Sequence, residues 1–531
     1  MAEIIPNVPP ADDEKNHVDH LPAELLATIF KFTAYSLKLG DYPNRGGHPW
    51  IYLSHVCRRW RTVSLACQEL WSMNLPRAND RWTAICLSRA PSMLLDVVLE
   101  YTYMYRGKAY HKAGLVVISQ WPRIKTLRVD LICELVADES SIGEAAQDTL
   151  DELFSKLSAP NPDLEELVLF LNTAKHDVPW FPVRLPPNVC SSQQLPRLRE
   201  VELRNCVLPH SSAHWPPFPS GLRVLKLVNT QAWDDTDFMI QILQELPLLE
   251  VLEHRFDNHH KAENVRCTPS LAHQSRCVSL PRLQNLILED CWLQNTIMFH
   301  HLAAPSSCNL TIHRSVWDSL HVPDTAEDAL QTYISTARES LVQHFASASS
   351  QQVVFDYVRL DDIEIFASSV PNGSHSGHAG LLPSELMISI PDTDDEDEHN
   401  PLLHAYFSHP VFTKTSRLGF SREIWSFYRD RYEEYTNVRQ IVLLYPSDVD
   451  AFTSALREKG AALFPMLSSV VVEPYVKDTD QAGDLVDALC NAHAASEQFE
   501  SLEIPARLFH EDFLSELRAK IGTHRLKERS M

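Results

Sequence analysis

Long apolar runs are absent from this chain of 531 residues, and none approaches the roughly 20 apolar residues that a membrane-spanning helix requires. The N-terminus has neither the basic start nor the apolar core of a secretory signal peptide. The 11 cysteines are spread along the chain without a C-x-x-C pair, and several lie in apolar patterns where a thiol acts as a small core residue. These absences predict an intracellular protein, cytoplasmic or nuclear, with reduced thiols.

Glycine is scarce, with 14 residues against 34 prolines, which disfavours glycine-rich loops that cradle phosphates. Nucleotide-binding, zinc-protease and serine-hydrolase motifs are also missing, so we predict neither an enzyme nor a cofactor. Positive charge is in deficit, since 47 Lys and Arg stand against 70 Asp and Glu, which gives a net charge of −23. Such a chain repels nucleic-acid phosphates and anionic lipids, so neither nucleic acid nor membrane is an expected partner.

Two stretches carry side chains that could bind a metal ion. Imidazole and thiolate are zinc ligands and are dense over 254–277, but their spacing matches no standard zinc finger. The residues concerned are His254, His259, His260, Cys267, His273 and Cys277. The acidic run 392–398 lacks the central glycine and the terminal glutamate of an EF-hand loop. A long loop between repeats and a solvated acidic loop explain both stretches, so no metal site is predicted.

The segment 21–71 carries the most specific pattern in the sequence. Its first part has apolar residues at helical spacing, together with a proline that suits the first turn of a helix. These residues are Leu21, Leu25, Leu26, Ile29 and Phe30. The second part repeats apolar residues at intervals of three and four, which places them on one helical stripe. These residues are Leu53, Val56, Trp60, Val63 and Cys67. Because about 50 residues bury little apolar area alone, we expect apolar surface to remain for a partner.

The order of residues in this segment resembles the F-box, although the match covers only about a tenth of the chain. The matching residues are Leu21-Pro22, Glu24-Leu25, Ile29-Phe30, Leu53-Ser54, Val56-Cys57, Arg59-Trp60 and Leu70-Trp71. The chain is thus similar to fungal-type F-box proteins, in which an irregular leucine-rich-repeat-like region follows the F-box. One departure is the stretch 33–50, a loop with several glycines and prolines that is longer than the usual connection.

The resemblance implies three helices that dock on a Skp-type adaptor, which links the chain to a cullin-RING ubiquitin ligase. Seven residues would line the adaptor contact or the small core behind it: Leu21, Pro22, Leu25, Ile29, Leu53, Val56 and Trp60. Leu25 and Val56 are expected to touch the adaptor, whereas Trp60 is expected mainly in the core. The same residues could instead form an ordinary helical hairpin that caps a larger domain.

A sequence motif of the form L-x-x-L-x-L, followed in the best copies by x-x-N/C, recurs through the rest of the chain. The clearest copies are Leu198, Val201, Leu203, Cys206 and Leu208, and then Leu283, Leu286, Leu288, Cys291 and Leu293. In the regular regions successive copies lie 24 to 40 residues apart, which is enough for one strand, a return element and turns. The motif resembles irregular leucine-rich repeats, in which each repeat buries the face of its strand only by stacking on its neighbours. Unrelated strands of a mixed α/β domain are the alternative.

We therefore predict an α/β chain, with an N-terminal three-helix F-box-like module followed by a leucine-rich-repeat-like solenoid with a curved parallel sheet. The expected divisions are a disordered N-terminus at 1–17, the adaptor-binding module at 18–75, the first part of the solenoid at 76–310, an irregular middle at 311–435 with mobile loops at 368–380 and 391–400, and the solenoid continuation with a C-terminal cap at 436–531.

The predicted function is that of a substrate receptor, which binds the adaptor through its N-terminal helices and a protein substrate through the repeats, and so supplies proximity. Exposed strand positions are expected to face the substrate, and their mixed charge suggests a polar protein surface. These positions are Glu165, Glu200, Glu202, Arg204, Arg223 and Lys226. The alternative is a repeat-based scaffold with no ligase link, whose N-terminal helices cap the repeats. A cap would turn its apolar face inward, whereas an adaptor-binding module would leave an apolar patch exposed.

Overall fold

The computed structural model describes most of the chain, in two compact units, Met1–Leu167 and Val168–Met531. The described residues are 21–38, 52–100, 108–132, 141–172, 183–186, 189–191, 193–209, 217–256, 269–314, 327–351, 353–360, 364–369, 385–389, 406, 408–473, 479–493, 498–505, 507 and 509–529. The segments 1–17 and 391–400, and most of 368–380, which were predicted to be disordered or mobile, lie outside these residues. In the described part of the chain, no helix combines the length and the apolar character that crossing a bilayer requires.

The first unit joins a layer of helices to parallel strands. Its elements are α1 (Ala23–Lys38), α3 (Arg58–Ala66), α4 (Gln68–Ser72), α5 (Asp80–Arg89), β1 (Leu95–Glu100), α6 (Lys108–Ile118), η2 (Trp121–Arg123), β2 (Ile124–Ile132) and α7 (Ser141–Leu157). β1 pairs with β2 in parallel, so that Val97 lies opposite Leu127 and Leu99 lies opposite Val129. All four of these side chains are buried, as the alternation of apolar residues in the sequence predicts.

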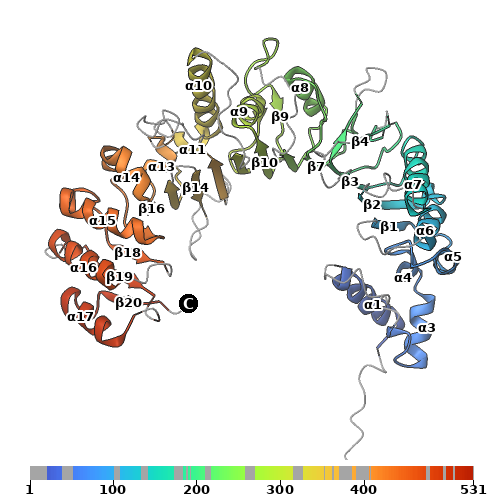
Figure 1. Ribbon diagram of the computed structural model, residues 1–531, viewed down its shortest axis with the longest axis horizontal. Coiled ribbons are helices and arrows are strands. Elements are labelled where there is room, and N and C mark those ends of the chain that lie inside the picture. Colours follow the sequence, from blue (N-terminus) through green and yellow to red (C-terminus); the bar gives the residue numbers. More distant parts are fainter. Residues whose placement is uncertain are drawn as a thin grey trace, which may run out of the picture. The chain divides into compact units, whose positions relative to one another are not determined.

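The second unit contains a large, mostly parallel sheet, whose strands follow the chain order except in the middle (Figure 1). In spatial order the strands are β3 (Glu166–Asn172, which begins just before the boundary), β5 (Glu200–Arg204), β7 (Val224–Val228), β8 (Val251–Arg255), β10 (Asn285–Asp290), β12 (Asn309–Arg314), β15 (Glu385–Ser389), β14 (Glu364–Ser368), β13 (Tyr357–Leu360), β16 (Arg417–Phe420), β17 (Gln440–Leu443), β18 (Ser469–Val472), β19 (Ser501–Ile504) and β20 (Leu526–Glu528). β14 is antiparallel to both β13 and β15, whereas β15 pairs with β12, and β13 with β16, in parallel. Two short parallel pairs lie outside this sheet, β4 (Val183–Arg184) with β6 (Cys206–Val207), and β9 (Val278–Ser279) with β11 (Leu302–Ala303).

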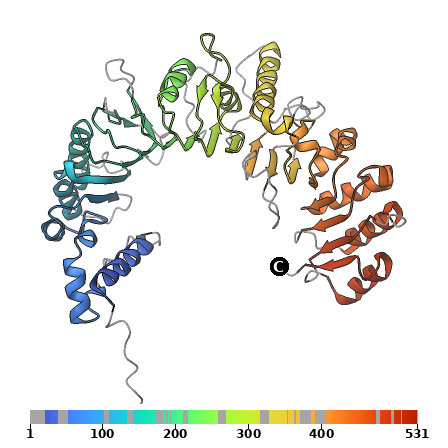
Figure 2. The same cartoon turned by 180° about the vertical axis from the view of Figure 1, so that it is seen from behind.

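Helices cover one face of the second unit's sheet, as both views of the ribbon show (Figure 1, Figure 2). They are α8 (Thr236–Gln244), α9 (Trp292–His301), α10 (Glu327–His344), α11 (Ala346–Ser350), α13 (Pro410–Thr413), α14 (Arg422–Tyr428), α15 (Pro446–Lys459), α16 (Thr479–His493) and α17 (Glu511–Ile521), with 3-10 turns η5 (Arg429–Glu434) and η6 (Gly460–Ala462). Burial alternates along β5 and β7, so that Val201 and Leu225 lie in the core while Glu202 and Lys226 lie on the opposite face, called here the open face. The prediction of an α/β chain with a parallel sheet is thus confirmed.

Buried histidines lie in this core, and His254 stands at a position where the repeated pattern favours leucine. His254 on β8 stacks on Trp233, with the two ring centres 5.1 Å apart, and burial lowers the pKa of His254 to about 3. His344 on α10 packs against Phe345, and burial likewise lowers its pKa to about 3. Both imidazoles are therefore neutral in the folded chain at neutral pH, whereas the unfolded chain protonates them near pH 6.5.

We expect acid to destabilise the second unit. As the pH falls below 6.5, these two histidines bind protons in the unfolded chain but remain neutral in the folded chain. Each of them therefore lowers the free energy of unfolding by about 1.4 kcal/mol per pH unit. The measurement is the urea unfolding midpoint of the full chain between pH 7 and pH 5, for the natural sequence and for His254→Leu. His254 and His344 contribute equally to the fall in unfolding free energy with pH. The His254→Leu variant should therefore lose about half of their joint contribution. An unchanged slope would show that His254 is not held neutral.

Candidate functional site

The inner side of α1 builds a small core in the first unit. Leu26, Phe30 and Ala34 recur at intervals of four residues and are buried. The ring centre of Phe30 lies 5.0 Å from that of Trp60 on α3. The helix begins directly after Pro22, whose carbonyl oxygen accepts a hydrogen bond from the Leu26 N–H at 3.1 Å. This core fixes α1 against α3 and determines which side of α1 faces outward.

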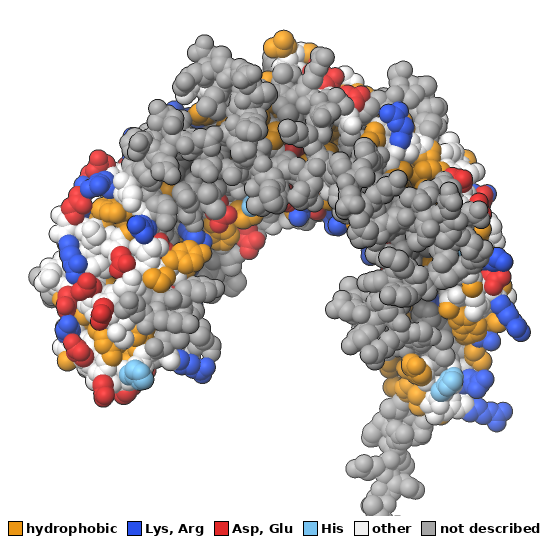
Figure 3. Space-filling view, viewed as in Figure 1, with side chains coloured by type: hydrophobic (Ala, Val, Ile, Leu, Met, Phe, Trp, Pro, Cys, Tyr) orange, Lys and Arg blue, Asp and Glu red, His pale blue; other side chains and the backbone are white. Residues whose placement is uncertain are grey.

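The outer side of α1 is apolar as well. Leu25, Ile29 and Phe32 follow the same helical spacing and are 51%, 44% and 69% exposed. The segment just before α3 adds Tyr52, in a helical turn, and Val56, in the turn that follows, which are 65% and 61% exposed. We call these five residues the N-terminal apolar patch, and Figure 3 shows hydrophobic side chains at the surface of this end of the chain. Exposed apolar clusters of this kind mark interaction surfaces, because water contact with them is unfavourable.

Polar contacts tie together the two segments that carry the patch. The guanidinium of Arg59 on α3 donates a hydrogen bond to the carbonyl oxygen of Leu21, just before α1. The Cys57 thiol caps α3 by accepting a hydrogen bond from the Trp60 N–H at 3.4 Å. Lys31 on α1 forms an ion pair with Glu69 on α4 at 3.4 Å. The turn that holds Val56 is therefore anchored at the start of α3, beside the start of α1.

Trp71 at the end of α4 joins this helical layer to α5. Its indole N–H donates to the carbonyl oxygen of Ser64 at 3.1 Å, and its ring centre lies 6.1 Å from that of Trp82. The guanidinium carbon of Arg89 lies 4.1 Å from the centre of the same ring, a cation–π contact. Trp71 is buried, so it supports the layer rather than contributing to the patch.

Arg77 and Leu75 connect the same layer to β1. The buried guanidinium of Arg77 donates to the carbonyl oxygen of Met73 at 3.0 Å, and burial lowers the pKa of this group. The Leu75 N–H donates to the Asp96 carbonyl oxygen at 2.9 Å, and its own carbonyl oxygen accepts from the Val98 N–H at 2.7 Å. The helices that carry the patch are thus continuous with the strand layer of the first unit.

The seven residues predicted for the adaptor contact divide into two groups. Pro22, Leu25, Ile29 and Val56 are exposed. Leu21, Leu53 and Trp60 are half-buried, and Trp60 packs on the buried Phe30. Sequence reasoning missed Phe32 and Tyr52. Phe32 lies seven residues after Leu25 and so extends the same helical stripe, a spacing that could have identified it.

The six charged residues predicted to face a substrate are mostly paired within the chain. Arg204 and Lys226 both form ion pairs with Glu202, the latter at 3.7 Å, and Arg223 pairs with Glu250 at 3.6 Å. Glu165, in the first unit, pairs with Lys125 at 3.2 Å. Glu200, on β5 in the second unit, is exposed. These pairs leave little net charge on this part of the open face.

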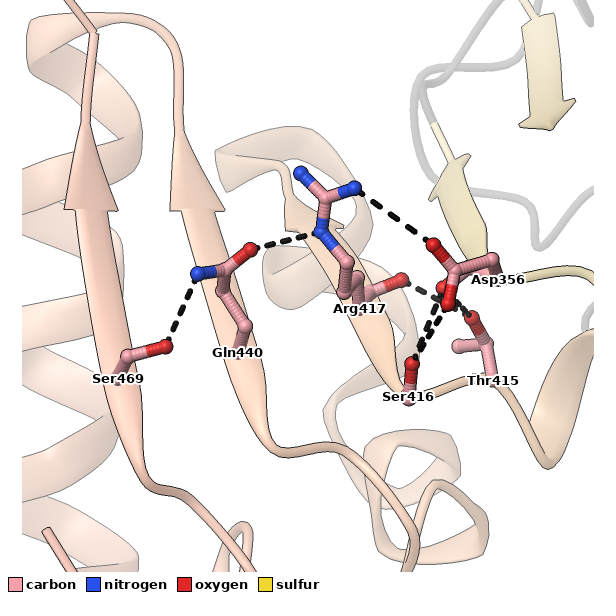
Figure 4. Close-up of polar contacts among 6 residues, drawn as sticks. All are labelled: Asp356, Thr415, Ser416, Arg417, Gln440 and Ser469. Carbon is pink, nitrogen blue, oxygen red and sulfur yellow. Dashed lines mark hydrogen bonds and ion pairs between the residues drawn. The ribbon is translucent and has the colours of Figure 1, made fainter. Parts of the chain in front are cut away.

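A second polar row crosses the open face at the start of β16, β17 and β18 (Figure 4). The Arg417 Nε–H donates to Gln440 Oε1 at 2.7 Å, and the Gln440 side-chain amide donates to Ser469 Oγ at 3.0 Å. Arg417 also pairs with Asp356 at 3.7 Å, and Asp356 accepts a hydrogen bond from the Ser416 hydroxyl at 3.1 Å. This row satisfies its own polar groups and holds the guanidinium of Arg417 in place.

The histidine and cysteine cluster is divided by the fold. His254 is buried on β8, and Cys277 Sγ lies 3.8 Å from His301 Nδ1 at the end of α9. His259, His260 and Cys267 lie outside the described residues. Among the residues that the structure does describe, no three His, Cys, Asp or Glu side chains are grouped so as to hold a metal ion.

Comparison with known proteins adds no relative to these observations. No protein-family model matches the chain, and no curated protein matches it. The N-terminal apolar patch is therefore interpreted from its own residues and geometry.

Proposed function

We propose that the chain is an F-box protein, the substrate-receptor subunit of a cullin-RING ubiquitin ligase, which docks on a Skp-type adaptor through α1 and α3. The observation that carries this proposal is the exposure of Leu25, Ile29 and Phe32 along one side of α1, beside an order of residues that resembles the F-box. A repeat scaffold whose helices served only as a cap would bury these three side chains. Their exposure favours a docking role.

We also propose that the second unit is a leucine-rich-repeat-like solenoid that holds the substrate. The alternation of strand and helix supports this, because β17, α15, β18, α16, β19, α17 and β20 follow one another along the chain. Consecutive strands pair in parallel, with Ile441 opposite Val470 and Val470 opposite Leu502. Each strand–helix pair covers the apolar face of the next pair, as stacked repeats do. Such a receptor performs no bond chemistry and contributes proximity between substrate and ubiquitin-loaded enzyme.

Co-purification with a Skp-type adaptor tests the proposed function. We expect the full chain to co-purify with the adaptor, and the double variant Ile29→Asp with Phe32→Asp to lose binding, because two charges would be placed in an apolar contact. Leu271→Asp is the matched control, since Leu271 is fully exposed in the second unit. Point variants are preferred to deletion of 1–75, because Trp71 and Leu75 support the rest of the first unit. Equal recovery of all three chains would contradict the proposal.

A further inference from the structure

The antiparallel pair β14 and β15 presents a distinct group of side chains on the open face. Ile365, Ala367, Leu386 and Ile388 are buried beneath the helices. By alternation, Glu364, Phe366 and Ser368 of β14, and Glu385 and Met387 of β15, lie on the opposite face, as does Ser389, which is itself buried. Phe366 is paired directly with Met387, Glu364 with Ser389, and Glu385 with Ser368. Along the strand direction, the apolar pair Phe366–Met387 thus lies between Glu364 at one end and Glu385 at the other.

The methyl group of Thr311, the side chain of Ile287 and the ring of Tyr357 extend this pair across the neighbouring strands. Met387 is paired with Thr311 on β12, and Thr311 with Ile287 on β10. On the other side, the ring of Tyr357 on β13 lies 6.1 Å from that of Phe366. These three neighbours are half-buried, as are Phe366 and Met387 themselves, so all keep some contact with solvent. The centre of the group is therefore an apolar strip on a face that no described helix covers (Figure 1).

The two glutamates are not neutralised by neighbouring cations. Among the described residues, no ion pair joins Glu364 or Glu385 to another side chain, whereas Glu289 on β10 pairs with Arg255 at 3.3 Å. Arg359 is paired with Phe366 across β13 and β14, but its guanidinium carbon lies 5.5 Å from the ring centre of Tyr445, after β17. The side chain therefore runs away from β14. Two carboxylates are left flanking an apolar strip.

Gly419 on β16 allows Arg359 to take this path. A Cβ atom added at Gly419 would lie 2.9 Å from the Arg359 Cβ and 2.8 Å from the Tyr357 hydroxyl oxygen, closer than such contacts occur. Arg417, the next cation on this face, is held by Asp356 and Gln440 (Figure 4). Of the cations nearest to Phe366, Arg359 is thus directed away from Glu364 and Glu385. The guanidinium carbon of Arg417 lies 5.5 Å from the ring centre of Tyr357, and its charge is already paired with Asp356.

The dimensions of the group match an extended peptide. Glu364 and Glu385 lie four residue positions apart along the strand direction, which is about 13 Å at roughly 3.3 Å per residue. In an extended peptide, side chains that share a face recur at every second residue, so the first, third and fifth residues span the same length of about 13 Å. A peptide with cations at the two ends of this span and an apolar residue between them would complement both charges and the strip.

We propose that the open face of β14 and β15 binds an extended protein segment of the form basic–x–apolar–x–basic, with the apolar side chain on Phe366 and Met387 and the two cations at Glu364 and Glu385. The segment lies along the strands. If the chain is the receptor proposed above, this is the class of its substrate.

Fluorescence anisotropy on the full chain, without adaptor, tests this binding. The probe is a pool of labelled nine-residue peptides with Lys or Arg at the third and seventh positions and Leu, Ile, Met or Phe at the fifth. A matched pool carries Asp or Glu at the third and seventh positions. We expect the basic pool to bind and the acidic pool not to bind. Added salt should weaken binding, since both ion pairs are exposed.

Variants on the open face locate the site. Glu364→Gln with Glu385→Gln should weaken binding of the basic pool about tenfold, which corresponds to two exposed ion pairs. Phe366→Ser and, separately, Met387→Ser should each weaken it about tenfold or more through loss of the apolar contact. Glu503→Gln, on the open face at β19, is the control and should bind normally. Circular dichroism shows whether each variant is folded.

The proposal is overturned if the two pools bind equally, or if the basic pool binds with affinity that the Glu364 and Glu385 variants do not change. Adaptor recovery is measured on the same variants and should stay normal, because they lie in the other unit. Peptide binding without adaptor binding would retain this site and remove the ligase link. Adaptor binding without peptide binding would retain the receptor function and remove this substrate class.

Discussion

Replacing Leu25 and Val56 together with alanine is expected to abolish recovery of the full chain by a Skp-type adaptor. Both side chains are more than half exposed, at 51% and 61%, so neither contributes much to the core of the first unit. Removing a central anchor from such a contact commonly costs about 2 kcal/mol, and two anchors about 4 kcal/mol if they act independently. That corresponds to roughly a thousandfold loss of affinity.

The same double variant should melt close to the natural chain, because substitutions at exposed positions usually change stability by less than about 0.5 kcal/mol. The measurements are adaptor affinity by biolayer interferometry and the thermal midpoint by circular dichroism. Leu271→Ala, in the second unit, is the matched loss of an exposed leucine and should leave both unchanged. Normal affinity in the double variant would remove Leu25 and Val56 from the contact.

Replacing Trp71 with alanine is expected to destabilise the first unit by about 3–5 kcal/mol, the usual effect of removing a buried aromatic side chain. The substitution removes the hydrogen bond to Ser64, the contact with Trp82 and the cation–π contact with Arg89. Adaptor binding should then be lost through unfolding, although Trp71 is not in the N-terminal apolar patch. The measurement is the unfolding midpoint in urea together with adaptor recovery.

Trp71→Phe separates packing from contact. Phenylalanine retains part of the ring packing on Trp82 but cannot donate to the Ser64 carbonyl oxygen, so an intermediate loss of stability is expected. Adaptor affinity measured where this variant is folded should be close to normal. A variant that is fully folded and yet unable to bind would show that Trp71 itself belongs to the contact.

Local pattern was enough to predict the elements whose apolar residues repeat regularly. The spacing of Val201 and Leu203, and of Leu286 and Leu288, predicted strands with one buried face, and all four residues are buried on strands. Thr230 stands where the clearest copies of the sequence pattern carry Cys206 and Cys291. Its hydroxyl accepts a hydrogen bond from the Cys206 N–H at 3.3 Å and donates one to the Leu203 carbonyl oxygen at 2.9 Å, so it satisfies two backbone groups of the neighbouring strand segment.

The arrangement of the middle strands could not be predicted in the same way. The residues of β13, β14 and β15 alternate like other strands, but their order in the sheet and the reversal of β14 depend on long-range pairing. The pairing of Phe366 with Met387, and the path of Arg359 over Gly419, follow from that register and have no local signal. Phe32 and Tyr52 were overlooked for a different reason: the resemblance directed attention to motif positions, and exposure is a property of the packed helices.

Calorimetric titration of the folded full chain with a purified Skp-type adaptor, repeated at several temperatures, tests the central claim most directly. Docking through Leu25, Ile29, Phe32, Tyr52 and Val56 predicts binding with a negative heat-capacity change, because apolar surface leaves water, and loss of that binding in the Leu25 and Val56 double variant. A full chain that is folded by circular dichroism and shows no binding heat at any temperature would contradict it, and a repeat scaffold would remain.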